Sequence, residues 1–167
     1  MIAFQKTATL CGIVAAIALS ISSSAADPAS EVAAIHAVDQ AWVKAYNAGD
    51  VDTVASCYDE HAVLLPPGAP AAHGRAAIRA FLANGMAAFA KDGLSFSLDA
   101  KPAGGASGDM GWASGSYTVK DKSGRVVDAG KYLSVSRKKD GKWLYIRDTW
   151  NSDGPPASVE PAPPVKK

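Results

Sequence analysis

The sequence predicts an α+β domain in which helices come first and an antiparallel sheet follows. Apolar residues recur every three or four positions through the first half of the chain, which is the period of a helix with one buried face. From about residue 94 onward apolar and polar residues alternate, as they do in half-buried strands. Glycine-containing turns at Ser123-Gly124 and Asp140-Gly141 separate the last three alternating runs. Helices should therefore pack on one face of the sheet.

The first helix is predicted from a stripe formed by Ile35, Val38 and Trp42. Ser30 is a candidate N-cap, and Gly49 can end the helix in a left-handed conformation. Asp50 should cap a short second helix. A third helix is expected to begin near Gly74 and to present Ile78, Phe81, Leu82, Met86 and Phe89.

Strands are predicted from short alternating runs that end at proline or glycine. Residues 101–108 are rich in glycine, alanine and proline and are expected to form a loop. The expected strands span residues 62–65, 94–99, 110–120, 126–136 and 142–150.

The two ends of the chain read as separate segments. Residues 1–26 combine Lys6, an apolar core and small residues before Ala26, the order found in a signal peptide. Cleavage after Ala26 would export the protein to the periplasm or the extracellular space; a membrane anchor is the alternative. Residues 27–153 form the expected domain, and residues 154–167, with five prolines, an expected disordered tail.

Composition excludes several classes of function. The chain has 17 Lys and Arg and 16 Asp and Glu, so it lacks the basic excess of a nucleic-acid-binding protein. After signal cleavage no membrane span is expected, and Cys57 becomes the one remaining cysteine. The spacing of His36, His61 and His73 fits no metal motif. We expect no metal and no cofactor.

The last strand carries the residue that is most suggestive of chemistry. A period of two places Leu144, Ile146, Asp148 and Trp150 on one face, where a carboxylate is costly to ionise unless it is paired. On the preceding strand the same reasoning places Lys131, Leu133 and Val135 on one face. Folding the hairpin near residues 138–140 would bring Lys131 opposite Asp148. Such a pair is either a plain cross-strand ion pair or the polar anchor of an apolar pocket.

The opposite face of the last strand would then carry Trp143 and Tyr145. Aromatic rings of this size are rarely left in solvent without a partner. We therefore expect a homodimer through the outer face of the sheet, centred on these two residues.

Several segments together resemble the nuclear-transport-factor-2-like superfamily, in its SnoaL-like and ketosteroid-isomerase-like branch. The matching segments are residues 46–50 (YNAGD), 58–63 (YDEHAV), 74–81 (GRAAIRAF), 130–132 (GKY), 140–143 (DGKW) and 148–153 (DTWNSD). The resemblance implies a cone-shaped barrel, in which the N-terminal helices pack within a strongly curved, mainly antiparallel sheet. It implies frequent dimers and a pocket between helices and sheet. Pocket residues implied by it are Trp42, Leu82, Lys131, Leu133, Ile146, Asp148 and Trp150.

The chain departs from the ketosteroid isomerases at each of their chemical groups. Trp42 stands where those enzymes have a tyrosine that stabilises the oxyanion. Leu65 and Pro66 stand near the position of their proton-shuttling aspartate, and Lys131 stands at their protonated aspartate. Ordinary steroid isomerisation is therefore not expected.

The function expected from these observations is an exported domain that binds a small hydrophobic molecule. One alternative is an isomerase, cyclase or dehydratase acting on a hydrophobic carbonyl compound, with Asp148 as base and Lys131 as its electrostatic partner. A second alternative is a dimerising interaction module of the cell envelope.

Overall fold

The computed structural model describes residues 27–154. The expected signal peptide, its cleavage site, and all but the first residue of the expected tail lie outside the described residues. Within the described part, no helix is long and apolar enough to cross a membrane.

Three helices begin and end close to their expected positions. They are α1 (Pro28–Ala48), α2 (Val51–Ser56) and α3 (Gly74–Asp92). Gly49 ends α1 with a φ of 74°, and the Asp50 side chain accepts a hydrogen bond from the backbone N–H of Thr53 to cap α2. Helix α1 starts earlier than expected, because Asp27 rather than Ser30 is its N-cap and Pro28 occupies its first turn.

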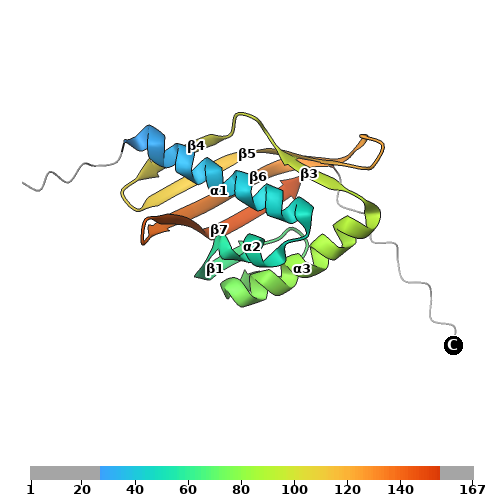
Figure 1. The fold of residues 1–167 in the computed structure, drawn as a ribbon, viewed down its shortest axis with the longest axis horizontal. Coiled ribbons are helices and arrows are strands. Elements are labelled where there is room, and N and C mark those ends of the chain that lie inside the picture. The colour runs from blue at the N-terminus through green and yellow to red at the C-terminus, as the bar shows by residue number, and fades with distance from the viewer. Residues whose placement is uncertain (1–26, 155–167) are drawn as a thin grey trace, which may run out of the picture.

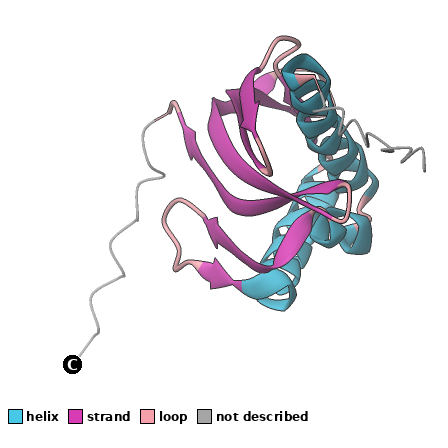
Figure 2. Ribbon diagram, turned by 90° about the vertical axis from the view of Figure 1, so that its left-hand side faces the viewer, coloured by secondary structure: helices cyan, strands magenta, loops and turns pink. Residues whose placement is uncertain are grey.

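One curved sheet packs its concave side against these helices (Figures 1 and 2). The strands are listed here with their bounds: β1 (Tyr58–Leu65), β2 (Ala72–His73), β3 (Ser95–Leu98), β4 (Ala103–Ser107), β5 (Met110–Lys120), β6 (Val126–Lys139) and β7 (Lys142–Ser152). The described order is β2-β1-β7-β6-β5-β3, with β4 also pairing with β5. Among the strand pairs of residues 27–154, only β1–β7 is parallel. The predicted α+β class and curved, mainly antiparallel sheet are confirmed.

Strand β4 forms where a loop was expected. It pairs with the first half of β5 and lies under α1. A Cβ at Gly104 would lie 2.7 Å from Nε2 of His36, and one at Gly105 would lie 2.6 Å from the indole nitrogen of Trp112. The glycines that argued against a strand are thus needed for the close approach of this strand to its neighbours.

The β6–β7 hairpin turns at Asp140-Gly141, as predicted, with positive φ at both residues. Its register, however, shifts by one position: Val135 pairs with Arg147, whereas Ser136 pairs with Tyr145. Ile146 is therefore the extra residue of a β-bulge. On the N-terminal side of the bulge Trp143 and Tyr145 point inward, and on its C-terminal side Asp148 also lines the interior. Strict alternation would not allow both.

The strict alternation assumed for β7 was wrong for its first half. Trp143 and Tyr145 are 5% and 4% exposed, so they cannot be the centre of a dimer interface on the outer face. Trp143 donates a hydrogen bond to Glu31 of α1 (2.8 Å), which Lys138 also contacts at 2.6 Å. A homodimer through the outer face of the sheet stays a prediction, but Trp143 and Tyr145 are not at the centre of its interface.

The inward face of β6 is also the opposite of the one expected. Ser134 and Ser136 are buried at 2% and 0% exposure, whereas Leu133 is 45% exposed on the outside. Lys131 is exposed and forms an ion pair with Asp153. It pairs in register with Asn151, whereas Asp148 pairs with Ser134. The expected Lys131–Asp148 pair is therefore wrong, because the two side chains leave the sheet on opposite faces.

The inward orientation of Trp143 can be tested against Trp112, which lies on the outer face of β5 and is 42% exposed. We expect Trp143→Ala to lower the free energy of unfolding by about 3–5 kcal/mol, because it empties a packed site and leaves Glu31 without a donor. Trp112→Ala should cost less than about 1 kcal/mol. Urea denaturation of both variants measures the difference, and equal losses would contradict the bulge.

Candidate functional site

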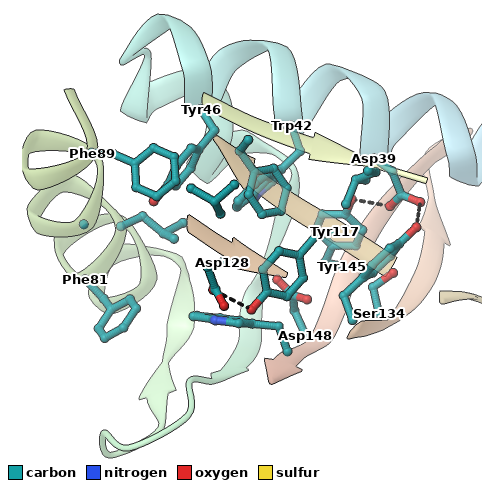
Figure 3. A pocket seen from close by; sticks show the side chains of 17 residues that line it. Asp39, Trp42, Tyr46, Phe81, Phe89, Tyr117, Asp128, Ser134, Tyr145 and Asp148 are labelled. Atoms are coloured by element: carbon teal, nitrogen blue, oxygen red, sulfur yellow. Dashed lines mark hydrogen bonds between the residues drawn. The ribbon is translucent and has the colours of Figure 1, made fainter. Parts of the chain in front are cut away.

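A cavity of about 270 Å³ lies between α1, α3 and the concave face of the sheet (Figure 3). Its walls are mostly aromatic, and its carboxylates come from α1 and from strands β6 and β7. The lining residues are Asp39, Trp42, Tyr46, Phe81, Leu82, Gly85, Phe89, Phe96, Leu98, Tyr117, Val119, Asp128, Tyr132, Ser134, Tyr145, Asp148 and Trp150.

The aromatic walls are built by contacts between helices and strands. Trp42 and Tyr46 project from successive turns of α1 and stack with ring centroids 4.8 Å apart. Phe96 of β3 meets Trp42 edge-on at 5.7 Å, and Phe89 of α3 meets Tyr46 at 5.3 Å. Packing of this kind fixes the rings, so the apolar walls of the cavity are preformed.

Asp39 of α1 forms one polar cluster at the cavity. Its side chain is 2% exposed. The hydroxyl of Tyr145 donates to its Oδ1 at 2.5 Å, and the hydroxyl of Tyr132 donates to its Oδ2 at 3.4 Å (Figure 3). Burial raises the pKa of Asp39, and the bond from Tyr145 opposes this shift.

Asp148 of β7 forms a second cluster. The hydroxyl of Tyr58 donates to Oδ2 of Asp148 at 2.6 Å, and Tyr58 in turn accepts a bond of 3.1 Å from the indole N–H of Trp42. Burial raises the pKa of Asp148 to about 6, the bond from Tyr58 lowers it, and the nearby charge of Asp39 raises it further. A carboxyl group with such a pKa exchanges its proton readily near neutral pH.

Two more polar groups complete the lining. Asp128 of β6 accepts a hydrogen bond of 3.0 Å from the hydroxyl of Tyr117 (Figure 3). The Oγ of Ser134 is buried and has no hydrogen-bond partner within the described residues. Ser134 lies directly across the sheet ladder from Asp148. A buried hydroxyl without a partner is costly, and Ser134 is one of the residues that line the cavity.

The structure brings four of the residues expected at the site to the cavity and leaves three outside it. Trp42, Leu82, Asp148 and Trp150 are among the lining residues. The other three belong to the outer part of the sheet and are Lys131, Leu133 and Ile146. Ile146 is displaced by the bulge, and the other two lie on the outward face of β6. What Asp148 does chemically stays a prediction.

Sequence reasoning missed Asp39, Tyr132, Ser134 and Tyr145 as parts of the site. One signal was available, since Asp39 falls on the same helical stripe as Ile35 and Trp42, and a carboxylate on an apolar stripe is unusual. The tyrosines and the serine gave no such signal, because their faces depend on the bulge and on which side of the sheet the helices cover.

Cys57 directly precedes Tyr58 and belongs to the same core cluster. Cys57 is buried, and burial raises the pKa of its thiol to about 11, which makes it a poor nucleophile. Among the residues that the structure describes, no three His, Cys, Asp or Glu side chains are grouped so that they could hold a metal ion.

Solved structures share this fold. An NTF2-like protein with a cystatin-like fold from Novosphingobium aromaticivorans superposes with a TM-score of 0.66 at 21% identity, over 74% of this chain and 82% of that one. A ketosteroid isomerase-like protein from Erwinia carotovora is 26% identical, with a TM-score of 0.57 over 75% and 98%. A candidate dehydratase of the NTF2-like family from Streptomyces avermitilis is 19% identical, with a TM-score of 0.62 over 74% and 96%.

No curated protein matches the chain. The sequence profile of the SnoaL-like domain matches residues 40–146. This range runs from the middle of α1 through the bulge of β7, and so contains most of the cavity described above. With this match the chain belongs to the SnoaL-like domain family, and its curved sheet and covering helices have the fold of NTF2-like proteins.

Proposed function

We propose that this protein binds a small, mainly apolar molecule whose polar end lies against the carboxylates of the sheet. The observation that carries this proposal is the cavity itself, in which aromatic walls surround a compact set of polar groups. Apolar surface supplies affinity in such a site, and a few convergent polar groups fix the orientation of the ligand.

Acid–base catalysis is a second candidate, favoured by the pKa of about 6 at Asp148. A base with this pKa is largely ionised at neutral pH and still able to hold a proton. Catalysis on a carbonyl compound also needs donors for the developing oxyanion. The hydroxyls of Tyr58, Tyr132 and Tyr145 already donate to carboxylates, and the Ser134 hydroxyl, which has no partner within the described residues, is buried. We therefore propose ligand binding, rather than catalysis, as the main function.

Filling the cavity should abolish binding. Leu98 lines the cavity, and Leu98→Trp would occupy part of its volume. We expect native mass spectrometry of wild-type protein from its own cells to show a retained small molecule, and the variant to lose it. Leu65→Trp is the matched control, because Leu65 is 44% exposed outside the cavity. Retention by Leu98→Trp would place the ligand elsewhere.

Asp148 should lower the stability of the fold when it is ionised. Its pKa lies above the ordinary value of 3.8, so the folded state binds this proton more tightly than the unfolded state. The stability associated with the protonated form is present below about pH 4 and is lost as the pH rises through about 6. We expect Asp148→Asn to be about 1–3 kcal/mol more stable than wild type near pH 8. Urea denaturation should show this gain shrinking toward zero near pH 4, and a gain independent of pH would argue against a buried charge.

If Asp148 acts as a base, the protein should accelerate exchange of carbon-bound protons. We expect 2-tetralone in D₂O to exchange its α-protons faster with wild-type protein than with Asp148→Asn, as measured by NMR. Asp52→Asn, at an exposed site on α2, should exchange like wild type. Exchange at the buffer rate with wild-type protein would remove catalysis of this type and leave the binding proposal intact.

A further inference from the structure

We infer that the ligand of this cavity is a hydrophobic organic cation: an amine that is protonated at neutral pH and carried on an aromatic or alicyclic ring system. This inference rests on the proposed binding function and specifies the chemical class of the ligand. It follows from the charges, the hydrogen-bonding groups and the walls of the cavity, taken in turn.

The charges that border the cavity are all negative. Asp39, Asp128 and Asp148 line it, and no lysine, arginine or histidine is among the lining residues. The four ion pairs found within the described residues all involve other carboxylates. Uncompensated carboxylates in an apolar surrounding are unfavourable, and a bound cation would supply the missing countercharge. A bound anion would add to the repulsion.

The carboxylates of the cavity are acceptors, and the tyrosine hydroxyls beside them already donate to them. The hydroxyl protons of Tyr58, Tyr117 and Tyr145 are already directed at carboxylate oxygens. Asp148 receives the hydroxyl of Tyr58 at Oδ2 and a backbone bond from Thr149, and an ionised carboxylate has lone pairs for a further donor. Its neighbour Ser134, directly across the ladder, has a buried Oγ without a partner within the described residues. An ammonium group can donate to the Asp148 carboxylate, since it carries several donors and no acceptor.

The walls suit the same class of ligand. Cations are attracted to the faces of aromatic rings, most strongly to tryptophan and more so where water is excluded. Trp42, Tyr46, Phe81 and Trp150 project into the cavity from α1, α3 and β7, and the tyrosines of the sheet add further rings (Figure 3). The same rings bury the hydrocarbon part of the ligand. Aromatic walls around carboxylates thus match a cation with a large apolar body.

The test compares three naphthalene compounds of nearly equal shape and different charge. They are 1-naphthylmethylamine, 1-naphthalenemethanol and 1-naphthoic acid, which are cationic, neutral and anionic near pH 7.5. We expect isothermal titration calorimetry to show at least about tenfold tighter binding of the amine than of the alcohol, and no measurable binding of the acid.

Variants show whether the preference arises from the cavity. Asp148→Asn keeps the shape of the side chain and removes its charge, and it should bring the affinities for amine and alcohol close together. Asp128→Asn provides the same readout should Asp148→Asn fail to fold. The matched control is Asp52→Asn, whose carboxylate is 78% exposed and pairs with Arg79 outside the cavity, and it should keep the wild-type preference.

Acidification provides an independent reading. As the pH falls through about 6, protonation of Asp148 should weaken binding of the amine and leave the alcohol unaffected. The tyrosines around it remain neutral, because burial raises their pKa values. The ionisable groups around Asp148 are Asp39 of α1, Tyr58 of β1, Tyr132 of β6 and Tyr145 of β7. His36 of α1 acts on Asp39 and so affects Asp148 indirectly.

The possible outcomes separate this inference from the proposed function. Binding of the alcohol as tight as that of the amine, or binding of the acid, would overturn the cation inference and leave the binding function in place. A preference that survives both aspartate variants would also overturn it. Absence of binding by all three compounds to wild-type protein would overturn the inference together with the proposed function.

Discussion

The extra residue at Ile146 in β7 is the constraint on which the interior of this protein depends. Without it, a strand with strict alternation could place either Tyr145 or Asp148 inside the sheet, but not both. With the register shift between Val135 and Ser136, Trp143 and Tyr145 pack beneath α1 and Asp148 still lines the cavity. The bulge also bends the strand, in keeping with the curvature of the sheet around the helices (Figure 2).

Helix α1 is held on the concave face by acidic side chains as well as by apolar packing. Glu31 accepts from the indole of Trp143 and pairs with Lys138 near the start of the helix. Two turns further on, Asp39 accepts from Tyr145 and Tyr132. These bonds fix the height and rotation of α1 over the sheet, and thereby place Trp42 and Tyr46 in the wall of the cavity. The residues that join helix to sheet are thus partly the residues that line the site.

The buried polar groups of the cavity lower the stability of the fold. Buried carboxylates with neutral donors as their partners are less favourable than paired charges or apolar residues would be. A fold selected for stability alone would replace them or supply a cation. Here Asp39 and Asp148 are retained within hydrogen-bonding reach of tyrosines, and Ser134 has no hydrogen-bond partner among residues 27–154. Unfavourable polar groups that converge on a preformed cavity are characteristic of binding and catalytic sites.

The sequence by itself determined the order of the three helices and of every strand except β2 and β4. It also determined the cap at Asp50, the glycine end of α1 at Gly49 and the turn at Asp140-Gly141, because these depend on a few neighbouring residues. It also predicted the family, and it placed Trp42, Leu82, Asp148 and Trp150 at the site. Only the tertiary structure decided which face of each strand points inward.

Alternation along β6 separates Leu133 from Ser134 but does not say which lies inside, since apolar residues can cover the outside of a sheet whose interior is partly polar. The bulge at Ile146 is likewise set by pairing with β6 and by packing against α1. Asp39 therefore meets Tyr145, and Asp148 meets Tyr58 rather than Lys131, through contacts between residues far apart in the chain.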